Sequence, residues 1–70
     1  MKESIKAKEL AVQEVLKLYK RNPTKKDIVL EALGKIGGIK AIEAIMMISK
    51  KYPSKKELVI KSLGEAGKNS

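Results

Sequence analysis

Two pairs of lysines stand where the sequence could bind an anion. The letters PTKK occupy positions 23–26, and thirty residues later PSKK occupies positions 53–56. Each lysine pair is predicted to lie in the first turn of a helix, where the helix dipole disfavours a cation by roughly 0.3–1 kcal/mol. The backbone amides of a helix start favour phosphate, and lysine side chains there add charge. Because the same local rule is broken twice, the lysine pairs indicate an anion-binding function.

Further cations near these positions extend the basic set. Two basic pairs close the preceding helices, where a cation meets the negative end of the dipole. In a stack of helix pairs, equivalent turns lie on one edge, ~10 Å apart. We therefore predict one basic edge, the lysine ridge, made of Lys20, Arg21, Lys25, Lys26, Lys50, Lys51, Lys55 and Lys56. Tyr52 either adds a contact to this ridge or packs against its turn.

Patterns for catalysis are missing from the sequence. The chain has no His and no Cys, which leaves no catalytic triad, no thiolate metal site and no disulfide. Its eight acidic residues are scattered, with no convergent pair evident. The stretch GEAGKNS at 64–70 lacks the spacing and the preceding strand of a phosphate loop, and is interpreted as a frayed C-terminus. The sequence favours a protein that is not an enzyme, with no cofactor, no metal and no small-molecule substrate.

The overall charge points to polyanionic partners. Seventy residues predict a single domain, 1–70, and 16 Lys+Arg against 8 Asp+Glu give a net charge of +8. A lysine-rich, thermophile-like surface is the alternative explanation, but such a surface needs matching Glu for ion-pair networks. The charged N-terminal residues and the lack of a run of roughly 20 apolar residues predict a cytoplasmic, intracellular protein that is not secreted.

An internal repeat organises the whole chain. Aligning Pro23 with Pro53 pairs residues 23–37 with 53–67, and seven of these fifteen positions are identical. A fixed period of this length is typical of stacked structural units. We place repeat one at about 5–37 and repeat two at about 39–67.

Each repeat is predicted to form two helices. Apolar residues recur at helical spacing over about 2–20, 25–36 and 39–51, and again in the second lysine-containing segment after position 54. Thr24 with Asp27, and Ser54 with Glu57, have the spacing of capping boxes, and Gly37-Gly38 ends the second helix. The first two apolar faces include Ile5 and Ile28. The sequence thus predicts an all-α fold of four helices, arranged as two stacked antiparallel helix pairs.

The second helix of each unit carries a recognisable motif, EALGKIGG at 31–38 and KSLGEAGK at 61–68. Together with the period of about 30 residues, this motif resembles the short HEAT-like repeat of the phycobilisome-lyase type. The resemblance covers nearly the whole chain as two units. It implies close helix packing at Gly34 and Gly64, and a binding scaffold rather than a catalyst. The family usually carries Val-Arg where this chain has its two lysine pairs.

Apolar residues at the end of the stack form a second candidate surface. Leu30 and Ile60 occupy equivalent positions where a following repeat would make contact, and only Leu30 has a following repeat. Met46 and Met47 either fill the core or, in the sharper interpretation, form a contact surface. Met47, Ile60 and Leu30 are therefore candidate contacts for a protein partner or a second copy. In this alternative the protein is an adapter or oligomerising subunit, and its basic surface only keeps it in solution.

The residue types of the ridge suggest how it would bind nucleic acid. Tyr19 and Tyr52 are the only aromatic residues, so the sequence offers no row of stacking platforms for single-stranded bases. Arg21 is the only arginine, which argues against reading of guanine edges. The mode of binding that remains is contact with the phosphate backbone, without sequence specificity. Both DNA and RNA have such a backbone. A membrane is not expected, because no apolar face adjoins the ridge. The leading interpretation is an accessory component of a DNA- or RNA-handling assembly.

Overall fold

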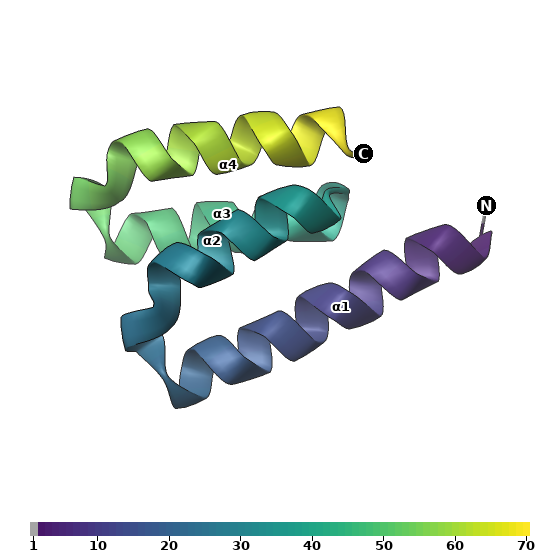
Figure 1. The fold of residues 1–70 in the computed structure, drawn as a ribbon, viewed down its shortest axis with the longest axis horizontal. Coiled ribbons are helices and arrows are strands. Elements are labelled where there is room, and N and C mark those ends of the chain that lie inside the picture. The colour runs from purple at the N-terminus through teal and green to yellow at the C-terminus, as the bar shows by residue number, and fades with distance from the viewer. Residues whose placement is uncertain (1) are drawn as a thin grey trace.

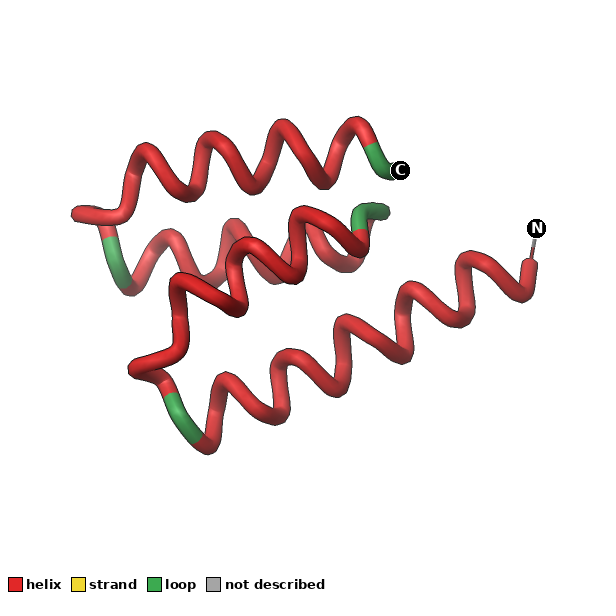
Figure 2. Tube along the Cα trace, in the orientation of Figure 1, coloured by secondary structure: helices red, strands yellow, loops and turns green. Residues whose placement is uncertain are grey.

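The protein is built from helices alone in the part of the chain that the structure describes. The computed structural model describes residues 2–70, with side chains from residue 5 onward. These residues form α1 (Lys2–Arg21), α2 (Lys26–Ile36), α3 (Ile39–Lys51) and α4 (Lys56–Lys68), and 3-10 turns at Pro23–Lys25 and Pro53–Lys55 precede α2 and α4 (Figures 1 and 2). The predicted all-α fold is confirmed.

The helices stack in two layers. Within each repeat the helices run antiparallel, α1 with α2 and α3 with α4 (Figure 1). The most extensive contact is between α2 and α4, while α1 packs on α2 and α3. Both proline-containing turns lie at one edge of the molecule, and the turn at 37–38 and the C-terminus lie at the opposite edge (Figure 1). This topology is what brings the two lysine pairs to a common edge.

The turn before α2 differs from the predicted capping box. No side chain caps α2, and the Thr24 hydroxyl instead donates a hydrogen bond to the Asn22 side-chain oxygen at 2.7 Å. The 3-10 turn supplies the missing partners, because the backbone amide of Lys25 donates to the Asn22 carbonyl and that of Lys26 donates to the Pro23 carbonyl. The equivalent turn before α4 also lacks a side-chain cap. The capping-box prediction was therefore wrong for both repeats.

The turn between the repeats requires glycine. Gly37 and Gly38 have φ values of 75° and 91°, which side-chain-bearing residues rarely adopt. A Cβ atom on Gly37 would lie 2.6 Å from Asn69. The predicted end of the second helix at these glycines is confirmed.

The core lies between the layers. Its largest fully buried side chains are Leu30, Leu33, Ile45 and Ile48, two from each repeat. Two residues assigned to apolar faces from the sequence lie outside it, because Ile5 and Ile28 are mostly exposed. Ile28 lines an open groove between α1 and α2, and Ile5 lies near the N-terminal end of the long helix α1.

The C-terminus is bound to the rest of the molecule rather than frayed. Helix α4 continues through Lys68, so the sequence-based interpretation of residues 64–70 was wrong. The Asn69 side-chain amide donates to the Gly34 carbonyl at 3.1 Å, and the Ser70 hydroxyl accepts a hydrogen bond from the Gly38 amide at 3.2 Å. Lys8 donates to the Asn69 carbonyl from α1. These contacts join three segments at the edge opposite the lysine ridge.

Candidate nucleic-acid interface

The two halves of the lysine ridge touch each other across the boundary between the repeats. The Lys55 Nζ atom lies 3.2 Å from Asp27 Oδ2, and the Lys26 Nζ atom lies 4.9 Å from the centre of the Tyr52 ring. Lys26 and Asp27 begin α2, whereas Tyr52 and Lys55 belong to the turn before α4. The predicted common edge is therefore present.

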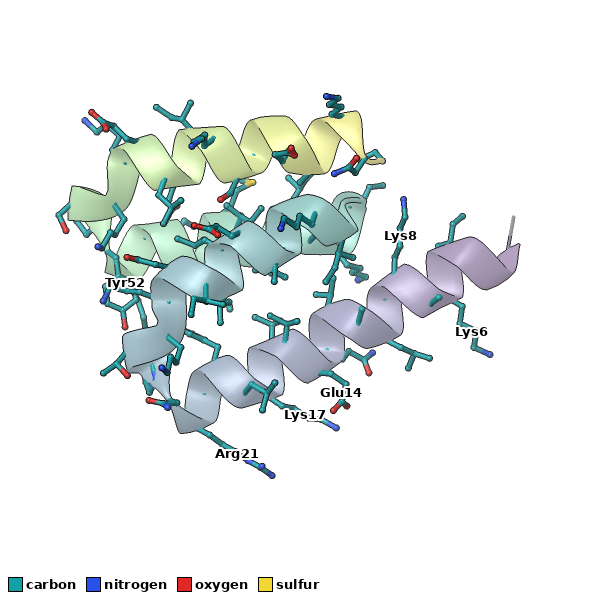
Figure 3. The ribbon with its side chains drawn as sticks, viewed as in Figure 1. Lys6, Lys8, Glu14, Lys17, Arg21 and Tyr52 are labelled. Carbon is teal, nitrogen blue, oxygen red and sulfur yellow. The ribbon has the colours of Figure 1, made fainter. Side chains whose placement is uncertain are left out.

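Most of the ridge cations are open to solvent. Lys26 and Lys55 are partly buried, and the six exposed members are Lys20, Arg21, Lys25, Lys50, Lys51 and Lys56. Four of these six close α1 and α3, as predicted, where the helix dipole stabilises a cation. Arg21 extends from the end of α1 away from the other helices (Figure 3).

Two of the four lysines that the helix dipole disfavours have a structural explanation. The carboxylate of Asp27 partly offsets the cost of placing Lys55 before α4, and the Tyr52 ring attracts the Lys26 ammonium through its π face. Both contacts join repeat one to repeat two. Among the described side chains, Lys25 and Lys56 have no ion-pair or ring partner. An anion-binding role is therefore not needed to explain Lys26 and Lys55.

Three backbone amides at the helix starts are already engaged in hydrogen bonds. The amides of Lys25 and Lys26 are already bonded to carbonyl groups of the preceding turn, and the Lys55 amide donates to the Tyr52 carbonyl at 3.0 Å. Amides engaged in this way are not available to a phosphate. What the ridge offers a ligand is the charge of its exposed side chains.

Tyr52 has the packing role that was the alternative prediction. It is partly buried, Lys26 lies over its ring, and its hydroxyl accepts a long hydrogen bond from Tyr19 at 3.5 Å. Burial, followed by the hydrogen bond and the electrostatic effect of Tyr52, raises the pKa of Tyr19 to about 12. The Tyr19 hydroxyl therefore stays neutral at ordinary pH, and the two tyrosines join α1 to the second turn. We assign no base stacking to either ring.

No protein-family model, curated protein or solved structure matches the chain. The HEAT-like resemblance stays a prediction. The stacked arrangement of the helix pairs follows from the contacts between the helices alone. Nowhere in residues 2–70 is there a helix long and apolar enough to cross a membrane. The described side chains also form no group of three or more acidic residues suited to a metal ion.

The predicted partner contacts divide into one buried and two exposed residues. Leu30 is 0% exposed, so its assignment as a contact for another molecule was wrong. Its counterpart Ile60 is 64% exposed, as expected for a position without a following repeat. Met46 and Met47 are about half exposed and do not fill the core. Met47 lines a groove between α1 and α3, which Ile60 on α4 does not share.

An apolar groove on the outer face of the first repeat was not predicted from the sequence. It lies between α1 and α2, has a volume of about 520 Å³ and includes the exposed side chains of Leu18 and Ile28. The repeat contained a signal for it. Leu18 is equivalent to Ile48 and Ile28 to Leu58, both of which contribute to packing in the second repeat. The first repeat has the same apolar pattern, and among residues 5–70 no helix covers Leu18 and Ile28.

Proposed function

We propose that the lysine ridge binds the phosphate backbone of nucleic acid without sequence specificity. The protein would act without catalysis, as an accessory component of a DNA- or RNA-handling assembly. The observation that carries this proposal is that six exposed cations belong to two separate turns and their flanking helix ends, and that these two turns lie at one edge of the molecule. They belong to a chain of net charge +8.

The chemistry of the ridge favours backbone contact over base reading. Five of the six exposed cations are lysines, whose ammonium groups meet phosphate as mobile point charges. A single arginine offers little capacity for bidentate reading of guanine. Each lysine that neutralises a phosphate releases a condensed counterion, which makes binding depend steeply on salt. Duplex DNA and structured RNA both present such a backbone.

A salt titration with a short duplex tests this proposal. If all six exposed cations contact phosphates, affinity should fall on the order of a thousandfold between about 50 mM and about 200 mM salt. Fluorescence anisotropy of a labelled duplex measures this fall. Binding that is undetectable at the lowest salt, or that hardly changes with salt, would contradict the proposal.

Two variants of equal net charge separate the ridge from bulk charge. The first replaces four ridge cations with glutamine, and the second replaces four exposed lysines elsewhere. Both lower the net charge from +8 to +4, because four cations are removed in each case. The ridge set is Lys20, Arg21, Lys50 and Lys51, and the control set is Lys6, Lys35, Lys61 and Lys68.

The ridge variant should lose about four units of salt slope, roughly one for each phosphate contact removed. The control variant should keep a slope close to that of the wild type. Equal losses in both variants would show that net charge, and not the ridge, governs binding. Lys26 and Lys55 stay unchanged in both variants because they hold the repeats together.

A further inference from the structure

The two outer faces of the stack leave apolar side chains uncovered. We call the outer face of α1 and α2 the leading face; it exposes Leu18 and Ile28 beside the groove described above. The outer side of α3 and α4 is the trailing face, which exposes Met46 and Ile60. Each pair comes from both helices of its repeat. Both faces are thus broader than a single exposed side chain.

The internal repeat shows what kind of surface would cover these faces. Shifting the leading-face residues by thirty positions gives Ile48, which is 0% exposed, and Leu58, which packs against the core. Shifting the trailing-face residues back by thirty gives Leu30, also 0% exposed, and Leu16, which is partly buried. Each outer residue therefore has a more buried counterpart in the other repeat. Two of these counterparts lie beside the neighbouring repeat, because Leu58 lines a groove with Gly34 and Leu16 lines one with Ala44. The leading face corresponds to the side that repeat two presents to repeat one.

Charged residues of the two turns show the same thirty-residue equivalence as the apolar residues. Inside the chain, Lys55 of repeat two pairs with Asp27 of repeat one. In the thirty-residue alignment, Lys25 of repeat one is equivalent to Lys55, and Glu57 of repeat two is equivalent to Asp27. Within the described side chains neither Lys25 nor Glu57 forms an ion pair. Their charges are opposite, and they belong to different repeats.

A glycine supplies a third, independent observation. A Cβ atom on Gly34 would lie 3.1 Å from the Ser62 carbonyl oxygen, so α4 packs closely on α2 at this position. The equivalent Gly64 has no atom within 4 Å of such a Cβ. Glycine inside a helix lowers helix stability, and nothing within the described chain requires it at position 64. A helix packed on α4 as α4 packs on α2 would require it.

We propose that a second copy of this chain stacks head to tail on the first. The leading face of one copy lies on the trailing face of the next, with α2 of one copy against Gly64 on α4 of the other. This contact reproduces the packing between the two repeats and pairs Lys25 of one copy with Glu57 of its neighbour. Because the two contacting surfaces differ, the assembly grows into a ring or a filament. The inference does not rest on nucleic-acid binding.

Two variants that each block one face provide the test. Leu18→Glu places a charge on the leading face, and Ile60→Glu places one on the trailing face. Both sites are exposed, so circular dichroism should show that each variant keeps the helical fold. Sedimentation analysis without nucleic acid should show the wild-type mass rising above 7.7 kDa with concentration. Each variant alone should remain at 7.7 kDa, and an equimolar mixture should form a one-to-one dimer and nothing larger.

Several results would overturn the proposal. One is a wild-type chain that stays at 7.7 kDa at all concentrations, which would leave both faces to a different partner. Others are a single variant that still self-associates, as a contact between two identical faces would allow, and a mixture that stays monomeric. Gly64→Gln gives an additional check, because it should weaken wild-type association at least tenfold without lowering the melting temperature of the monomer. Unchanged association of this variant would also contradict the proposal.

Discussion

Replacing Gly34 with glutamine should destabilise the protein severely, whereas the same replacement at Gly64 should be tolerated. At position 34 the new side chain would start 3.1 Å from the Ser62 carbonyl oxygen and 3.3 Å from the Ser62 Cα atom. These are backbone atoms of α4, so the clash is relieved only by moving the helix. Overpacking of this kind costs about 3 kcal/mol. A chain of this length has a total stability of roughly 3.5–10 kcal/mol.

Thermal unfolding of the two glycine variants measures this difference. The melting temperature should fall by roughly 12–24 °C for Gly34→Gln, since about 3 kcal/mol is lost from a small domain. For Gly64→Gln it should stay the same or rise, because removing glycine from a helix gains about 0.5 kcal/mol. The measurement is made at concentrations where the chain is monomeric. Similar losses in both variants would show that α2 and α4 do not pack as described.

Leu30→Ala and Ile60→Ala should also differ clearly in their effect on the free energy of unfolding. The two positions are equivalent in the repeats, but Leu30 is fully buried and Ile60 is mostly exposed. Removing the Leu30 side chain leaves a cavity between the layers and should lower the free energy of unfolding by about 2–5 kcal/mol. The change at Ile60 removes a solvent-exposed side chain and should alter it by less than about 0.5 kcal/mol.

Urea denaturation of dilute, monomeric protein gives both free energies of unfolding. Ile60→Ala serves as the matched control, because it removes a branched aliphatic side chain at the same place in the other repeat. A loss above about 2 kcal/mol for Ile60→Ala would mean that its face is covered within the monomer, contrary to the structure. A loss below about 1 kcal/mol for Leu30→Ala would contradict its burial.

The helical architecture could be predicted from the sequence because it follows from local patterns. Apolar periodicity placed the helices, and the Gly37-Gly38 pair marked the end of the first repeat. The period of thirty also indicated that Leu30 and Ile60 would differ in their surroundings, which the structure confirms. Basic residues at the ends of α1 and α3 were likewise recognisable from their positions after an apolar helix.

The local hydrogen bonds of the turns could not be predicted in the same way. Thr24 has two possible partners, the amides of the following helix and the side chain of Asn22, and the 3-10 turn removes the need for the first. A spacing pattern does not distinguish between them. The bonds from Asn69 to Gly34 and from Gly38 to Ser70 join residues far apart in the chain, so no local signal announces them.

The sequence pattern also could not predict the contacts between the two repeats. Lys26 and Lys55 broke the helix-dipole rule, and function was the explanation that sequence alone favoured. The structure shows partners for both, because the spacing of α2 and α4 brings Asp27 and Tyr52 within reach. The remaining six exposed cations lie at the ends of α1 and α3 and at the starts of α2 and α4. The candidate site is therefore smaller than predicted, and its binding role stays a proposal.

The lysine ridge is tested most directly by following the backbone amide resonances of the wild-type protein while a short DNA duplex is added at low salt. The largest chemical-shift changes should fall on residues 20–27 and 50–57, and they should disappear when salt is raised. Changes centred on the opposite edge, at residues 37–40 and 68–70, would contradict the proposed interface, as would changes spread evenly over all exposed lysines.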